Sequence, residues 1–205
     1  MKRLIFIFPL TLSLLFSCEK KQPEASSQNS SEEVVKDNFI NKDSSAEGTF
    51  IKYAHSYNNF ITDNQGYIIE KNILFTHALE SNAAPEELSG LYKSLLEQTQ
   101  VSIDSVQKLG SFNGNVEYKE AAISLFKFYL EAWGEYKGLI DLKTKEERVK
   151  VYEKLKTKFN DAHSKTEKVL EDKFVQAHTN FANSNELHVR KTGLHEKLDS
   201  ILYLK

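Results

Sequence analysis

Two groups of histidine and carboxylate residues are spaced so that they could do chemistry. His77 and Glu80 lie three positions apart, which on a helix places both side chains on one face. Imidazole and carboxylate are common ligands of zinc and iron. A second group, His195, Glu196 and Asp199, begins like a zinc-protease helix but has an aspartate where that motif has its second histidine. The first pair is therefore the better metal candidate, and its alternative is a histidine at the exposed end of a helix.

The spacing of His77 and Glu80 resembles the His-x-x-Glu motif of imelysin-like envelope proteins. This resemblance implies a helical protein that holds a metal or a small ligand. Ferritin-like bundles instead use Glu-x-x-His pairs on facing helices, and the sequence contains no such pair. A metal- or ligand-binding bundle of imelysin-like type is therefore one of two hypotheses about function.

The only cysteine, Cys18, follows an apolar run at residues 4–16 that is preceded by Lys2 and Arg3. The run is shorter than the about 20 helical residues that a bilayer core requires, but it has the length and flanks of a signal-peptide core. A single cysteine can form neither an intrachain disulfide nor a cysteine-based metal site. We therefore expect the leader to be removed and the thiol to be modified.

The four residues Leu15, Phe16, Ser17 and Cys18 resemble the lipobox of bacterial lipoproteins. The resemblance implies cleavage before Cys18 and acylation of its thiol, for example by palmitate. Several acyl chains, at about 0.8 kcal/mol per buried CH₂, make a firm anchor. Glu19 follows the cysteine instead of the aspartate that resembles an inner-membrane retention signal, which favours the outer membrane. The alternative is an ordinary secretory leader with an incidental cysteine.

The composition argues against several other classes of protein. The chain has 27 Lys and Arg residues against 29 Asp and Glu, so no basic footprint points to nucleic acid. It has no P-loop, no dinucleotide-binding glycine fingerprint and no Gly-x-Ser-x-Gly elbow. Nothing in the sequence supports a catalytic nucleophile with a base beside it. We therefore expect a protein that is not an enzyme and that carries no cofactor.

The chain divides into three predicted parts. Residues 1–17 are the leader, and residues 18–43 are rich in Ser, Asn and Glu, a composition typical of a flexible linker. Residues 44–205 contain few prolines and glycines and show apolar positions at helical spacing. They predict a helical bundle domain.

The apolar spacing predicts four long helices and a short fifth. The first begins at a capping box of Ser44 and Glu47, the second at Pro85, and a third spans about 116–142. The fourth begins at a second capping box, Thr144 with Glu147, and runs to about residue 183. A strong turn is expected at residues 113–115, and a short helix at 194–202. Short turns between long helices favour an all-α, up-down-up-down four-helix bundle.

Individual side chains are assigned from the same spacing. The aromatic residues of the third helix are expected in the core, while Tyr53, Tyr57 and Tyr67 hint at a polar cavity. Residues 145–173 mix both charge signs, which is typical of a solvated face. His163, Glu167 and His178 are accordingly expected at the surface. The residues of the third helix that we predict to lie in the core are Leu125, Phe126, Phe128, Tyr129, Trp133, Tyr136 and Ile140.

The organisation of the whole chain resembles helical surface lipoproteins of Leptospira and Bacteroidota. The resemblance implies a binding or scaffolding role in the cell envelope. The expected partners are the membrane, through the lipid on Cys18, and a protein or glycan of the envelope or of a host.

Overall fold

The computed structural model describes residues 16–20, 51–81, 83–142 and 144–191, and this part of the chain is mostly helical. The all-α prediction is therefore confirmed for these residues, with one addition, a two-stranded ribbon. In chain order the elements are β1 (Phe16–Lys20), α1 (Ala54–Ser81), α2 (Pro85–Lys108), α3 (Glu117–Gly134), α4 (Lys137–Ile140), α5 (Lys145–Ala162), α6 (Ser164–Ser184) and β2 (Leu187–Lys191).

Two helix starts that the sequence predicted are confirmed. Pro85 is the first residue of α2, where its missing N–H would have no partner in any case. At the start of α5 the Glu147 amide donates to the Thr144 hydroxyl at 3.2 Å, and the Thr144 amide donates to the Glu147 carboxylate at 3.3 Å. These reciprocal bonds are a capping box. The other expected capping box, Ser44 with Glu47, and the helix at 194–202 lie outside the described residues. The first helix nevertheless starts later than predicted, because residues 51–53 are not helical and α1 begins at Ala54.

The turn at residues 113–115 is also confirmed. Asn113 and Gly114 have φ angles of 50° and 78°, in the left-handed region that asparagine and glycine tolerate best. Their neighbours Phe112 and Asn115 exchange backbone hydrogen bonds of 3.2 and 2.9 Å. The tight hairpin reverses the chain between α2 and α3.

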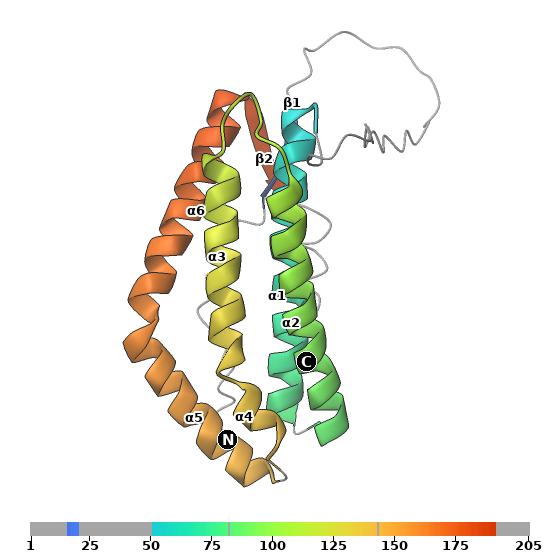
Figure 1. Cartoon of the computed structure of the whole chain (residues 1–205), viewed down its shortest axis with the longest axis vertical. Coiled ribbons are helices and arrows are strands. Elements are labelled where there is room, and N and C mark those ends of the chain that lie inside the picture. Colours follow the sequence, from blue (N-terminus) through green and yellow to red (C-terminus); the bar gives the residue numbers. More distant parts are fainter. Residues whose placement is uncertain (1–15, 21–50, 82, 143, 192–205) are drawn as a thin grey trace, which may run out of the picture.

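Two predicted long helices are each broken, which corrects the sequence interpretation. The helix expected over 116–142 is interrupted after Gly134 and continues as the short α4. The helix expected over 144–183 is interrupted at His163, between α5 and α6, and Figure 1 shows the chain changing direction there. Asn160, Asp161 and Ser164 around the second break are weak helix formers, but residues of that kind often continue a helix, so the sequence alone did not place the break.

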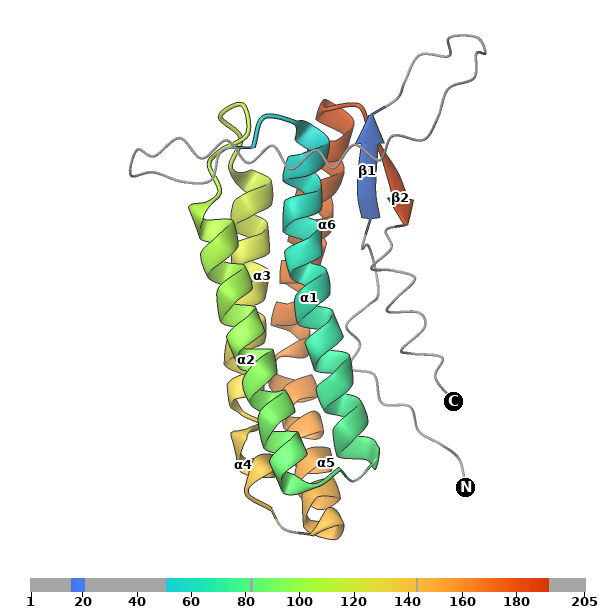
Figure 2. The same ribbon diagram turned by 90° about the vertical axis from the view of Figure 1, so that its right-hand side faces the viewer.

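The long helices lie side by side, as Figures 1 and 2 show. α1 packs against α2, α2 against α3, and α3 against α6. At one end the core is aromatic. The ring centroids of Tyr57 on α1 and Phe181 on α6 are 5.3 Å apart, and both rings contact Phe112. The aromatic band predicted on the third helix is confirmed as core, because Phe126, Phe128, Tyr129, Trp133 and Tyr136 are all buried. Edge-to-face and offset ring pairs of this kind stabilise a core beyond the area they bury.

A ribbon joins two distant parts of the chain. β1 pairs antiparallel with β2, with Cys18 opposite Val189, and β1 also packs against α1 (Figure 2). β1 crosses the predicted cleavage position between Ser17 and Cys18 and includes the start of the predicted linker. None of the helices in the described ranges is both long and apolar enough to cross a bilayer.

Candidate functional site

The predicted metal pair lies near the end of α1. His77 and Glu80 are both exposed. The pKa of Tyr152 on α5 is raised to about 12, mainly because Tyr152 is buried and in smaller part because of the negative charge of Glu80. Within the described residues no group of three or more His, Cys, Asp and Glu side chains is arranged to hold a metal ion. The metal site at this pair stays a prediction, and His195, Glu196 and Asp199 lie outside the described residues.

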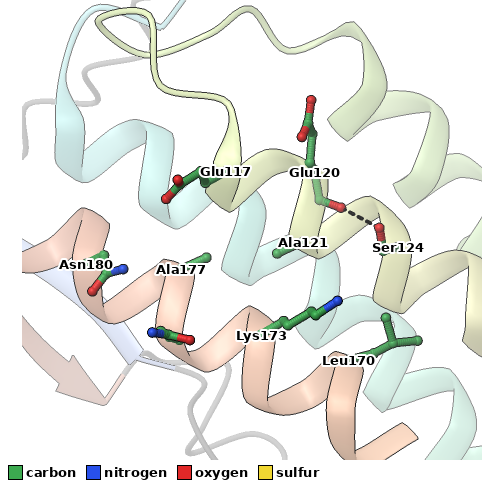
Figure 3. Close-up of a pocket in the computed structure, with 9 residues that line it drawn as sticks. Glu117, Glu120, Ala121, Ser124, Leu170, Lys173, Ala177 and Asn180 are labelled. Atoms are coloured by element: carbon green, nitrogen blue, oxygen red, sulfur yellow. Dashed lines mark hydrogen bonds between the residues drawn. The ribbon is translucent and has the colours of Figure 1, made fainter. Parts of the chain in front are cut away.

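An open groove lies between α3 and α6 (Figure 3). Its volume is about 450 Å³. Small side chains on both helices, Ala121 and Ala177, leave the space between the two backbones unfilled, and Leu170 closes one end of the lining. The polar lining residues are Glu117, Glu120, Ser124, Lys173, Gln176 and Asn180.

The groove is lined by polar side chains. Its lining offers carboxylates, amides and one ammonium group, which together can donate to and accept from a polar ligand. Ser124 is the lining hydroxyl, and it donates to the Glu120 backbone carbonyl at 2.8 Å instead of to a base. Lys173 extends from α6 across the groove toward α3. The arrangement fits binding and does not form a nucleophile with a base.

The sequence analysis did not identify this groove. On each helix the lining positions recur at three- and four-residue steps, a spacing that marks one helix face. That spacing is visible in the sequence. The neighbourhood of α3 and α6, which brings the two faces together, is a tertiary feature that spacing does not give.

A second polar region lies inside the molecule, and it corrects the expectation that Glu167 and His178 are surface residues. Their exposed fractions are only 5% and 2%. Both lie on the face of α6 that also carries Phe174 and Phe181. The Lys/Glu-rich sequence around them suggested a solvated helix, but this face is turned into the core.

Burial dominates the electrostatics of Glu167. It raises the pKa of the Glu167 carboxyl to about 7, and repulsion from the Glu171 carboxylate one turn later adds to the rise. The Tyr129 hydroxyl of α3 donates to the Glu171 carboxylate at 3.4 Å. Two carboxyl groups of α6 therefore face a phenol of α3, and they are close enough to influence each other's protonation.

His178 lies in the aromatic end of the core. Its ring is 5.4 Å from that of Tyr118, and its Nε2 atom finds no hydrogen-bond partner among the described residues. Burial lowers the pKa of His178 to about 4, because the charged imidazolium is disfavoured away from water. His178 therefore packs as a neutral ring at neutral pH.

A small ion-pair network connects the two helix breaks. The Glu135 carboxylate, just after α3, accepts from Lys158 of α5 at 2.9 Å and contacts the His163 Nε2 atom at 3.1 Å. The hydrogen bond from Lys158 is the main reason that the pKa of Glu135 lies below its ordinary value. His163 was expected at the surface, whereas its side chain is 25% exposed and forms part of this network.

The three tyrosines in and just before α1 do not mark a polar cavity. Tyr53 and Tyr67 are exposed. Tyr57 is buried, and its hydroxyl donates to the Gly110 carbonyl at 3.2 Å. The hint taken from these three residues was therefore wrong.

Comparisons of the chain with protein-family models, with curated proteins and with solved structures found no match.

Proposed function

We propose that this chain is a lipid-anchored protein of the cell envelope, held in the outer membrane by acyl chains on Cys18. The observation that carries the proposal is the position of the only cysteine, directly after an apolar leader that ends in Leu-Phe-Ser. A lone thiol in an oxidising compartment is a liability unless it is consumed by modification.

We further propose that the helical domain is a non-catalytic binding module built as an up-down-up-down four-helix bundle. In this arrangement α5 and α6 together form the fourth rod of the bundle. The neighbour relations of α1, α2, α3 and α6 support this reading.

The groove between α3 and α6 is the proposed binding surface. Its carboxylates, amides and single ammonium suit a ligand rich in hydroxyl or amide groups, such as an envelope glycan. A polar groove of this kind gives orientation through hydrogen bonds, and its small apolar floor of Ala121 and Ala177 allows close approach of the ligand.

Mass spectrometry of the native protein tests the anchor. The expected result is a polypeptide that begins at Cys18 and carries the mass of acyl chains. A Cys18→Ser variant should keep its leader and lose membrane association. A native protein with a free thiol at position 18 and an intact leader would contradict the envelope assignment.

Capture of envelope glycans by the lipidated protein tests the groove. Lys173→Glu reverses the charge of the lysine that crosses the groove and should reduce capture at least tenfold. Lys93→Glu on α2 is the matched control, because Lys93 is exposed and makes only a surface ion pair with Glu97. Equal capture by both variants would exclude the groove as the binding surface.

A further inference from the structure

The two helix breaks lie together and form one joint, which we define as residues 134–136 and 163–167. Glu135 belongs to the first break and His163 to the second, and they are joined by the 3.1 Å contact. The His163 ring also lies 6.0 Å from that of Phe128, on the inner part of α3. The halves on either side of the joint therefore meet through a few named groups instead of through a continuous helix.

A buried carboxyl group sits one turn beyond the second break. Glu167 is 5% exposed, and its nearest influence is the Glu171 carboxylate, which carries the same charge. Lys158 of α5, close to the joint, is engaged by Glu135, and Lys165 within the joint is exposed to solvent. An ionised Glu167 would therefore be a buried anion beside a second anion, which is unfavourable unless the joint opens to water.

The other groups that face Glu167 do not offset this charge. From α3 and the following residues these are Tyr129 and Tyr136, and behind Tyr136 lies Tyr152 of α5. Burial raises the pKa of all three phenols, so they stay neutral through the range in which Glu167 titrates. Glu135 adds negative charge near Tyr136. Proton uptake by Glu167 is thus the change that neutralises the interior of the joint.

His163 supplies the contact that holds the two breaks together. Its Nε2 atom lies 3.1 Å from the Glu135 carboxylate, and its side chain is 25% exposed. Proton uptake by Glu167 therefore removes the charge inside a joint that this contact bridges.

We propose that the joint is a pH-responsive hinge, closed firmly when Glu167 carries a proton and loosened when it releases that proton. The hinge would control how α4 and α5 lie relative to α3 and α6. It is independent of the proposed anchor and of the groove, whose lining residues all lie outside the joint.

Hydrogen exchange of the joint amides between pH 5 and 8, divided by the intrinsic exchange rate at each pH, tests the hinge. Opening gives Glu167 an ordinary carboxyl environment, so the opening equilibrium should rise by up to about tenfold per pH unit to pH 7 and then level off. Glu167→Gln should remove this rise. Glu131→Gln, at an exposed position of α3, should behave like the wild type. His163→Asn, which removes the imidazole that contacts Glu135, should raise joint opening at every pH and leave the slope unchanged.

Two results would overturn the proposal. One is a rise that persists in Glu167→Gln. The other is a joint whose amides open no more readily than those of α1 and α2 at any pH, which would mean that the joint opens only when the whole fold unfolds. A second probe is built in: Trp133, the only tryptophan, stacks on Tyr129 at 5.4 Å. Its emission should change with a midpoint near pH 7 in the wild type and stay constant in Glu167→Gln.

Discussion

At the scale of single residues, the buried face of α6 shows what spacing can and cannot predict. Phe174 and Phe181 were expected to be apolar positions of the last long helix, and they are buried. Glu167 and His178 lie on the same face at helical steps, but their polarity led to the opposite expectation. Spacing gives the direction of a side chain, whereas the energetic tolerance for a buried polar group depends on neighbours that are distant in sequence, here Tyr129 and Tyr118.

Replacing Glu167 with glutamine should change the pH dependence of stability. The pKa of Glu167 in the folded protein, about 7, lies above the ordinary value of 4.5, so the folded state keeps a proton that the unfolded state releases. The stabilising contribution is complete below pH 4.5 and is lost as the pH rises to 7. The free energy of unfolding of Glu167→Gln, relative to that of the wild type, should therefore be about 1–2 kcal/mol higher at pH 8 than at pH 4. This is less than the full pKa shift implies, because solvent screens the charge in part. Urea unfolding of both proteins at pH 4 and pH 8 measures this change. The same difference between variant and wild type at the two pH values would refute the prediction.

Replacing His178 with phenylalanine should reduce sensitivity to acid. The pKa of His178 in the folded protein is about 4, below its ordinary value of 6.5, so the unfolded state takes up a proton first as the pH falls. Stability is therefore lost between pH 6.5 and 4, and His178→Phe should remove that loss while it keeps an aromatic ring beside Tyr118.

Between pH 4.5 and 6.5 the Glu167 and His178 effects oppose each other, so the wild type should show a flat profile there. Each single variant should reveal a slope of opposite sign, and the double variant should again be flat. Chemical unfolding across this range is the measurement, and two single variants with slopes of the same sign would contradict the assignment.

At the scale of elements, local chemistry predicted where helices begin but not where they break. The start of α5 follows from Thr144 and Glu147 alone, because a capping box is made within one turn. The breaks at Glu135 and His163 depend on each other, through a contact between residues 28 positions apart. No window along the sequence contains both sides of that contact, which is why continuous helices were predicted.

The capping box gives a prediction that belongs to α5. Thr144→Ala removes the hydroxyl that accepts from the Glu147 amide and should lower the free energy of unfolding by about 1 kcal/mol. Thr157→Ala is the control, because Thr157 is an exposed residue within the same helix that bonds only the Glu153 carbonyl. Since alanine is the better helix former, that variant should be neutral or slightly stabilising. A Thr144→Ala variant as stable as Thr157→Ala would mean that the cap contributes little.

At the scale of the whole molecule, the all-α architecture was predictable because four apolar stripes each require a partner. The groove was not, since it arises from which stripes become neighbours. The ribbon of β1 and β2 was also missed, because Phe16–Lys20 reads as the end of a leader and Leu187–Lys191 as the entry to a last helix. Neither segment has enough strand character alone, and pairing between positions so far apart in sequence is a property of the folded chain.

The single cysteine allows the ribbon to be tested together with the anchor. Cys18 lies opposite Val189 in the register, and facing residues of antiparallel strands have Cα separations of about 4.5–5.5 Å, within the range that a disulfide spans. In full-length protein made without lipidation, Val189→Cys should therefore oxidise to an intrachain disulfide, seen as a mobility shift that reductant reverses. Arg190→Cys, opposite Ser17, is the matched control and should cross-link far less.

The same variant tests the anchor in lipidated protein. Cys18, Glu19 and Lys20 remain after the predicted cleavage, but the Cys18 sulfur would carry the lipid, so Val189→Cys should form no intrachain disulfide. Absence of the disulfide in the unlipidated protein would refute the ribbon, whereas its presence in native envelopes would refute the anchor.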